Sequence, residues 1–225
     1  MWTISVKALC DYGCSSCDLC SKIKKLKDSE IYMEVDARIQ DFKNVNRYQE
    51  NDLFIEMCFC ILTANFSATR AIQIQDQLGM DFITLPQDLL VIRLKEVGYR
   101  FPNTRAQYIY DSRKWIKKLH EILYSYPKTE QKKLRNWIAE NIKGLGLKES
   151  SHFLRNIGFD DCAIIDFHIV DLLVSHLIIE RPKTLTKKRY QEVEQVLEKI
   201  AQIQGISLAE LDLYLWYMET GKILK

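Results

Sequence analysis

The run Ile142-Lys-Gly-Leu-Gly-Leu-Lys148 decides the fold, together with Asp166, which follows Lys148 by eighteen residues. Its two glycines stand one residue apart between two stretches of helical periodicity, which predicts a tight helix–hairpin–helix turn. The second helix is expected to begin at Leu147–Lys148, so its unpaired backbone N–H groups face outward and favour a phosphate. A lysine at that helix start, with a carboxylate returning from the next helix, is a candidate amine nucleophile with its partner.

Each of these residues also has a purely structural interpretation. The glycines at 144 and 146 fit a plain helix–helix connection, and Lys148 fits a solvated surface lysine. Asp166 stands at the start of an expected helix, where an N-cap contributes about 1 kcal/mol. The N-cap role and the catalytic role are compatible, and Asp166 could fill both.

Length and composition fit a buried core. The chain has 225 residues, of which 47% are hydrophobic and 28% charged, enough for one large domain or two small ones. No apolar run approaches about 18 residues, so no membrane-spanning helix is expected. The first nine residues do not have the pattern of a signal peptide. We therefore expect a cytoplasmic protein without a membrane partner.

The distribution of charge is more informative than the net charge, which is only +2. Residues 111–155 carry eleven Lys/Arg against five Asp/Glu, so the hairpin lies in a basic zone. Such a zone suits a phosphate backbone. A solvated, lysine-rich helix face gives the same pattern, and the charge alone does not separate the two interpretations.

The periodicity predicts an all-α protein. Glycine and proline are few and fall between periodic segments, and no convincing alternating strand pattern occurs, so we expect about nine or ten helices. The stretch Leu53–Ala64 is almost wholly apolar and predicts a helix that is buried on all sides. Pro102 is expected to open one long amphipathic helix, which Pro127 interrupts.

The hairpin and several other segments resemble one family of enzymes, the archaeal-type (type 2) 8-oxoguanine DNA glycosylase/lyases of the helix–hairpin–helix superfamily. The resemblance covers about residues 22–225. The segments that carry it are Asn141–Gly158, Ala163-Ile-Ile-Asp166-Phe-His168, Met57-Cys-Phe-Cys-Ile-Leu-Thr-Ala-Asn65-Phe, Gly98-Tyr-Arg-Phe101, Ser207–Tyr217 and Gly221-Lys-Ile-Leu-Lys225.

The resemblance implies a bifunctional repair enzyme that acts on double-stranded DNA containing oxidised guanine. By similarity, Lys148 attacks C1′ of the damaged nucleotide, expels 8-oxoguanine and forms a Schiff base, and β-elimination then cleaves the strand. Asp166 orients the attack and stabilises positive charge on the sugar, a sensible use of a nearby carboxylate in any family. Gly144, Leu145 and Gly146 hold a phosphate. No cofactor is implied, and we expect a monomer.

A damaged base must leave the helical stack to be reached, so the resemblance also implies a pocket. Phe101 and Trp216 are candidates for sandwiching the purine, and the terminal carboxylate of Lys225 is a candidate for reading its edge. Asn65 stands where related glycosylases place a residue that enters the duplex gap. Ordinary core packing, a frayed terminus and a turn residue are the structural alternatives for these positions.

Two features depart from the family pattern or add to it. Phe167 replaces an Arg that is common in close relatives, which leaves the contact made by that Arg open. Cys10, Cys14, Cys17 and Cys20 form a cluster in the first 21 residues, outside the usual family pattern. The expected site holds no metal, and zinc or iron–sulfur binding by this cluster is the alternative.

The resemblance implies two helical subdomains that flank a DNA-binding cleft. We expect a Cys-bearing extension over residues 1–21, a helical subdomain with the hairpin over 66–159, and a second subdomain made of 22–65 plus 160–225. Two alternative functions stay open at this point. One is a glycosylase/lyase for oxidised pyrimidines, and the other is a non-catalytic helix–hairpin–helix DNA-binding module, which needs the glycines but not Lys148 and Asp166.

Overall fold

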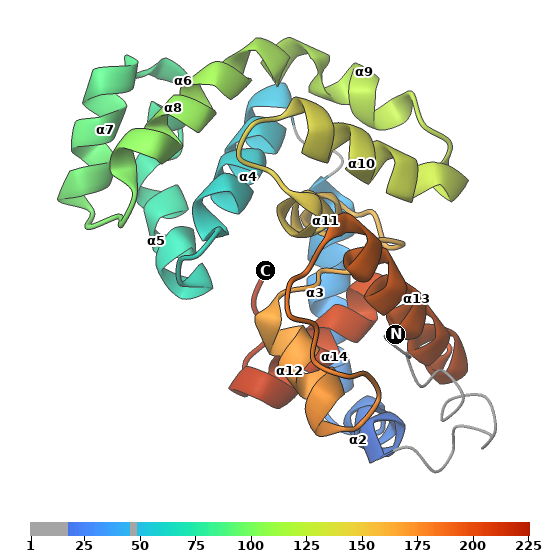
Figure 1. Ribbon diagram of the computed structural model, residues 1–225. Coiled ribbons are helices and arrows are strands. Elements are labelled where there is room, and N and C mark those ends of the chain that lie inside the picture. Colours follow the sequence, from blue (N-terminus) through green and yellow to red (C-terminus); the bar gives the residue numbers. More distant parts are fainter. Residues whose placement is uncertain (1–17, 46–48) are drawn as a thin grey trace. The chain divides into compact units, whose positions relative to one another are not determined.

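The computed structural model describes residues 18–45 and 49–225 and confirms the all-α prediction (Figure 1). Helices and their connections make up these residues, and no strand occurs among them. None of the helices in this part of the chain is long and apolar enough to cross a membrane. The described residues divide into two compact units, unit 1 with 18–41, 160–223 and 225, and unit 2 with 42–159 and 224.

Unit 2 contains the hairpin. Its elements, coloured from cyan through green to yellow in Figure 1, are α4 (Glu50–Thr63), α5 (Ala68–Leu78), α6 (Asp81–Thr84), α7 (Gln87–Glu96), α8 (Pro102–Ser112), the 3₁₀ helix η2 (Arg113–Lys118), α9 (Leu119–Tyr124), the 3₁₀ helix η3 (Lys128–Glu130), α10 (Gln131–Asn141) and α11 (Leu147–Asn156).

Helix α4 is the core of unit 2, as its apolar sequence predicts. Every residue from Glu56 to Thr63 is buried, and α4 contacts α5, α8 and α11. A helix that is apolar on all sides gains its stability by burying all sides, at about 25 cal/mol per Å² of apolar surface.

One charged residue of α4 is also buried, and it ties α4 to two neighbouring helices. An oxygen of the Glu56 carboxylate accepts a hydrogen bond from Asn156 of α11 at 2.6 Å, and the other accepts one from Gln75 of α5 at 3.0 Å. Since a buried carboxylate is costly without partners, these bonds fix the C-terminal end of α11 on α4.

Unit 1 contains Asp166. Its elements are α2 (Asp18–Lys27), most of α3 (Ile31–Val45), α12 (Phe167–Ser175), α13 (Lys187–Gln204) and α14 (Leu208–Thr220). Helix α14 contacts α2, α12 and α13. The segment before Asp166 is held by α13, because Tyr190 donates to the carbonyl of Ala163 at 2.6 Å and Glu194 accepts from the N–H of the same residue at 3.0 Å.

The structure differs from the sequence expectations in three places. Helix α2 begins at Asp18, inside the expected extension 1–21, because Leu19 and Cys20 are buried. The single helix expected after Pro102 is split into α8, η2 and α9, and at the start of η2 the Arg113 guanidinium donates to the carbonyl of Phe82 at 2.8 Å. Residues 42–65, expected beside 160–225, belong to unit 2, since α4 packs on α5, α8 and α11.

Candidate active site

The hairpin between α10 and α11 is held by two buried apolar side chains. Ile142 and Leu145 are buried, and the N–H of Leu145 donates to the carbonyl of Ile142 at 3.2 Å. Gly144 has φ +96°, a conformation that L side chains rarely adopt. The exposed parts of the turn are therefore Lys143 and the backbone at Gly146.

Gly144 is also required by a close contact. A Cβ atom at this position would lie 2.6 Å from Cδ2 of Tyr108, so the α8 ring packs directly against the hairpin backbone. The Nζ of Lys143 lies 5.5 Å from the centroid of the same ring. The sequence predicted the turn but not Tyr108 as its support, because that contact joins residues far apart in the chain.

The N-terminus of α11 begins at an N-cap without a side chain. Gly146 is the N-cap, with extended backbone (φ −85°, ψ −170°). Because glycine has no side chain that could accept a hydrogen bond, Gly146 itself does not compete with an incoming anion for the first N–H groups of α11. Helix dipole and free donors together favour negative charge here.

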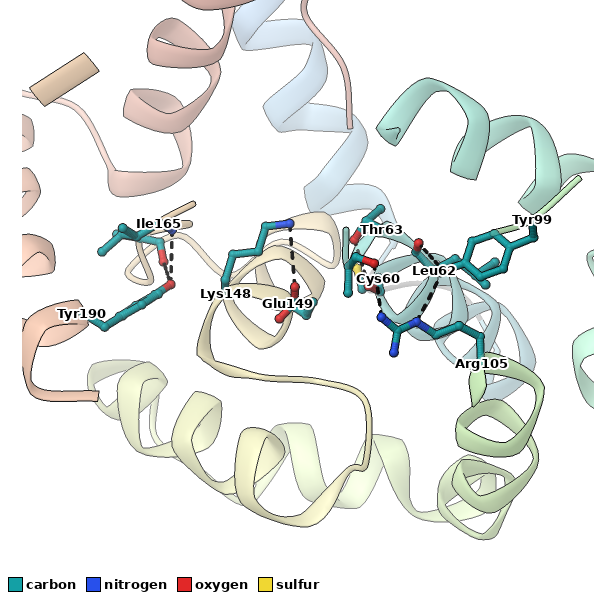
Figure 2. Close-up of polar contacts among 11 residues, drawn as sticks. Cys60, Leu62, Thr63, Tyr99, Arg105, Lys148, Glu149, Ile165 and Tyr190 are labelled. Atoms are coloured by element: carbon teal, nitrogen blue, oxygen red, sulfur yellow. Dashed lines mark hydrogen bonds and ion pairs between the residues drawn. The ribbon is translucent and has the colours of Figure 1, made fainter. Parts of the chain in front are cut away.

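Lys148 is the second residue of α11 and is partly buried, with 24% of its side chain exposed. Its Nζ lies 3.8 Å from Oε1 of Glu149 (Figure 2). The other carboxylate oxygen of Glu149 lies 3.2 Å from the place of a Cβ on Gly146, so this side chain folds back over the start of the helix. Glu149 is a site residue that the sequence interpretation missed, and its signal is an acidic residue at the third helical position.

His152 follows Lys148 by one helical turn. It is buried, and its ring meets that of Phe59 in α4 edge to face, with the centroids 5.4 Å apart. The imidazole therefore packs the inner face of α11 against the core of unit 2.

Asp166 is the N-cap of α12, as its structural interpretation predicts. One of its carboxylate oxygens accepts a hydrogen bond from the N–H of Ile169 at 3.1 Å. The second oxygen is not used by the cap, and the side chain is only partly buried. Asp166 belongs to unit 1 and Lys148 to unit 2.

The surroundings of Asp166 in unit 1 include one predicted pocket residue. Trp216 meets the ring of His168 edge to face, with 6.0 Å between centroids, and no described residue accepts a hydrogen bond from its buried indole N–H. Nδ1 of His168 lies 3.8 Å from Glu219. Phe167 is 66% exposed and so is not held by the core.

The other predicted site residues lie at the ends of helices. Phe101 is the residue before α8 and is exposed, with the Arg100 guanidinium 4.9 Å from its ring centroid. Asn65 is exposed and directly follows the C-cap of α4, with φ +58°. Gly221 ends α14 with φ +68°, and Lys225 follows four residues later and is partly buried.

The cysteine cluster is only partly visible in the structure. Cys10, Cys14 and Cys17 lie outside the described residues, and Cys20 is buried in α2. Among residues 18–45 and 49–225, no group of three or more His, Cys, Asp or Glu side chains is placed to hold a metal ion.

Comparison with known proteins gives consistent matches. The family described as 8-oxoguanine DNA glycosylase matches residues 35–206. Proteins named 8-oxoguanine DNA glycosylase/AP lyase are similar, at 47% identity from Methanocaldococcus jannaschii and 45% from Korarchaeum cryptofilum. These alignments cover 92% of this chain and 99% and 98% of the two relatives.

Solved structures are similar over the same extent. The M. jannaschii 8-oxoguanine glycosylase/lyase, in complex with a 15mer DNA containing 8-oxoguanine, aligns with a TM-score of 0.88 at 46% identity, covering 92% of this chain and 99% of that one. The Thermotoga maritima 8-oxoguanine DNA glycosylase aligns with a TM-score of 0.85 at 40% identity, with the same coverage.

Proposed function

This chain belongs to the helix–hairpin–helix 8-oxoguanine DNA glycosylase family, and we propose that it excises 8-oxoguanine from double-stranded DNA and cleaves the strand at the resulting abasic site. The observation that carries the proposal is Lys148 at the uncapped start of α11, directly after the glycine hairpin, in a chain 47% identical to a protein named for both activities.

The proposed reaction begins at the Lys148 amine. In its neutral form Nζ attacks C1′, the glycosidic bond breaks, and the base leaves with its bonding electrons and takes up a proton. The attached amine gives up one proton, which balances the proton taken up by the base. The C1′–O4′ bond then breaks, O4′ takes up a proton from solvent, and the nitrogen keeps its other hydrogen in the protonated Schiff base C1′=N⁺H. Removal of a proton from C2′ then expels the 3′ phosphate by β-elimination, which breaks the C3′–O bond. The nucleophile is a side chain, so these steps need no cofactor.

Asp166 supplies the negative charge in the proposed mechanism. Its free carboxylate oxygen stabilises the positive charge that develops on the sugar while the other oxygen caps α12. The N-cap bond also fixes the carboxylate orientation, since the side chain is tied to the N–H of Ile169.

The remaining residues bind DNA in the proposal. Gly144, Leu145 and Gly146 are the proposed phosphate-binding turn. The N–H of Leu145 is bonded to Ile142 within the turn, and the positive φ of Gly144 and the absence of side chains at both glycines expose the rest of the backbone. Phe101, Trp216 and Lys225 are the proposed contacts of the flipped purine, and Asn65 is the proposed residue that enters the gap left by the base. We further propose that the protein is a cytoplasmic monomer. Light scattering during gel filtration measures its mass in solution and so tests the monomeric state.

Borohydride trapping tests this function directly. The protein is incubated with duplexes that carry 8-oxoguanine, thymine glycol or an abasic site, and borohydride reduces any Schiff base to a stable adduct. We expect an adduct with the 8-oxoguanine duplex, none in Lys148→Gln, and a retained adduct in the matched variant Lys143→Gln. An adduct formed chiefly with thymine glycol favours the oxidised-pyrimidine alternative. No adduct with any duplex leaves only a DNA-binding module.

A further inference from the structure

A ladder of cationic and aromatic side chains crosses unit 2. At one end, the Arg70 guanidinium lies 5.7 Å from the ring centroid of Phe66, and the Phe66 and Tyr99 rings have centroids 4.5 Å apart. The hydroxyl of Tyr99 accepts a hydrogen bond from Nε of Arg105 at 3.4 Å. We call this set, with Tyr108 and Lys143, the cation–aromatic ladder.

The other end of the ladder reaches the hairpin. The Arg105 guanidinium lies 5.5 Å from the ring centroid of Tyr108, and Nζ of Lys143 lies at the same distance from that ring. Tyr108 packs against Gly144. Such cation–ring contacts are attractive because the ring face carries negative charge density. Arg105 is therefore the member that joins the two halves of the ladder.

Arg105 also caps the end of α4. Its Nη2 donates to the carbonyl of Ala64 at 3.1 Å. The Tyr99 hydroxyl donates to the carbonyl of Leu62 at 2.8 Å (Figure 2). Burial raises the pKa of Tyr99, so its hydroxyl keeps the proton it donates. Carbonyls at a helix end have no partner within the helix, and here two of them depend on side chains from outside it.

The turn that these bonds hold, residues 64–67, contains Asn65. The turn begins at the Ala64 carbonyl that Arg105 binds, and the N–H of Phe66 donates to the carbonyl of Thr63 at 3.2 Å. Asn65 itself has φ +58°, a left-handed conformation that asparagine tolerates better than most residues but that still needs support. Asn65 is exposed, so the support comes from its neighbours.

We propose that Arg105 is a positioning residue that holds the 64–67 turn in the shape that lets Asn65 enter the duplex, and that the ladder keeps this turn in register with the hairpin. This inference rests on the proposed function, since Asn65 has a gap to enter only where a base leaves the stack. Unstacking a paired base costs free energy, whereas an abasic site has no base to extrude. Loss of Arg105 therefore harms excision of a base more than reaction at an abasic site.

Hydrogen exchange without DNA tests the structural half of the proposal. In Arg105→Ala we expect the amides of residues 64–67 to exchange roughly tenfold faster than in the wild type, because the turn opens locally. The control Arg93→Ala removes an arginine that forms ion pairs with Asp81 and Glu96, and it should leave the exchange of residues 64–67 unchanged. Unchanged exchange in Arg105→Ala overturns the proposal.

Single-turnover kinetics tests the functional half. Arg105→Ala should excise 8-oxoguanine about tenfold more slowly, the effect of losing a charged hydrogen bond. Borohydride trapping on a preformed abasic duplex should stay within about threefold of the wild type, because no base must be extruded there. Arg105→Lys keeps the charge but not the planar fork, so it should show the same split with a smaller loss. An equal loss on both duplexes overturns the positioning role.

A double-mutant cycle tests whether Arg105 acts through Asn65. If Arg105 acts through Asn65, the variant with both Arg105→Ala and Asn65→Ala excises 8-oxoguanine no more slowly than Asn65→Ala alone. Multiplied losses overturn the proposal. A wild-type protein that leaves 8-oxoguanine in place refutes the proposed function instead, and the exchange experiment then still decides whether Arg105 holds the turn.

Discussion

Helices α11 and α12 begin in opposite ways. The N-cap of α11 is Gly146, which has no side chain, and Lys148, the proposed nucleophile, follows two residues later. The N-cap of α12 is Asp166, whose carboxylate accepts from the N–H of Ile169 at 3.1 Å. The start of α11 in unit 2 has no side-chain cap hydrogen bond, while the start of α12 in unit 1 satisfies a donor with its own carboxylate.

The difference shows how the same backbone end serves two tasks. A helix N-terminus favours negative charge whatever its source, so the choice of N-cap residue decides whether that charge is a ligand or a side chain. Glycine suits phosphate binding by α11, and aspartate fixes a carboxylate at α12. Lys148 follows the Gly146 cap, and Asp166 is itself the cap of α12. Substitutions at the two helix starts should therefore differ in their effects on excision and on DNA affinity.

The largest effect is expected at Asp166. Asp166→Asn keeps an N-cap of nearly equal quality but loses the charge, so excision of 8-oxoguanine should fall about 10²–10³-fold with little change in stability. Single-turnover excision, DNA affinity and thermal unfolding measure the three quantities. Thr186→Ala is the control, because it removes the N-cap of α13 and should lower stability by about 1 kcal/mol without slowing excision. Full activity in Asp166→Asn would leave the carboxylate with its cap role alone.

The hairpin glycines give the next largest effect, and they are not equivalent. Gly144→Ala puts a Cβ 2.6 Å from the Tyr108 ring at φ +96°. The backbone strain alone costs about 1–2 kcal/mol, and DNA affinity should fall at least tenfold in a fluorescence-anisotropy titration. Gly146→Ala meets only the flexible end of Glu149 at 3.2 Å and should weaken binding less. Equal losses in the two variants would contradict the assignment of the contact to Gly144.

Deletion of Lys225 should change base choice more than affinity. Lys225 is the proposed contact to the purine edge, so its removal should lower the ratio of excision rates for 8-oxoguanine over guanine about tenfold. DNA affinity should stay near that of the wild type, as titration with an undamaged duplex can show. An equal loss on every substrate would refute the recognition role.

The smallest effect is expected for the salt dependence of binding. Lys143 is exposed on the hairpin, and Lys143→Ala should reduce the slope of log affinity against log salt by about 1, the loss of one phosphate contact. Lys114→Ala, which removes a lysine that lies over Trp115 in η2, serves as the comparison. An unchanged slope in Lys143→Ala would mean that the turn binds phosphate through its backbone alone.

The sequence predicts features that depend on neighbouring residues and misses those that depend on distant ones. The Gly144–Gly146 turn and the N-cap at Asp166 follow from residue types at short spacing, and the structure confirms both. The support of Gly144 by Tyr108 could not be predicted, because it joins residues thirty-six positions apart. The break between α8 and η2 has no glycine or proline to mark it.

The hydrogen bonds of the buried polar residues likewise could not be predicted from the sequence. In the sequence, Glu56 is a single charged residue in an apolar helix. Its hydrogen bond from Asn156, a hundred residues later, could be found only from the fold. From the sequence alone, Arg105 is expected to be one of several exposed charges on an amphipathic helix. Its bonds to Ala64 and Tyr99 arise from the packing of α8 beside the end of α4, which no periodicity encodes.

The burial of sulfur in the described part of the chain has a chemical consequence. Cys20, Cys58, Cys60 and Cys162 are all buried, and burial raises the pKa of the Cys58 thiol well above its usual range. Peroxide attacks thiolates that it can reach, so these sulfurs resist conversion to sulfenic acid. Conditions that oxidise guanine in DNA also oxidise exposed thiols. A repair protein whose core sulfurs stay reduced under such conditions keeps its fold while its substrate accumulates.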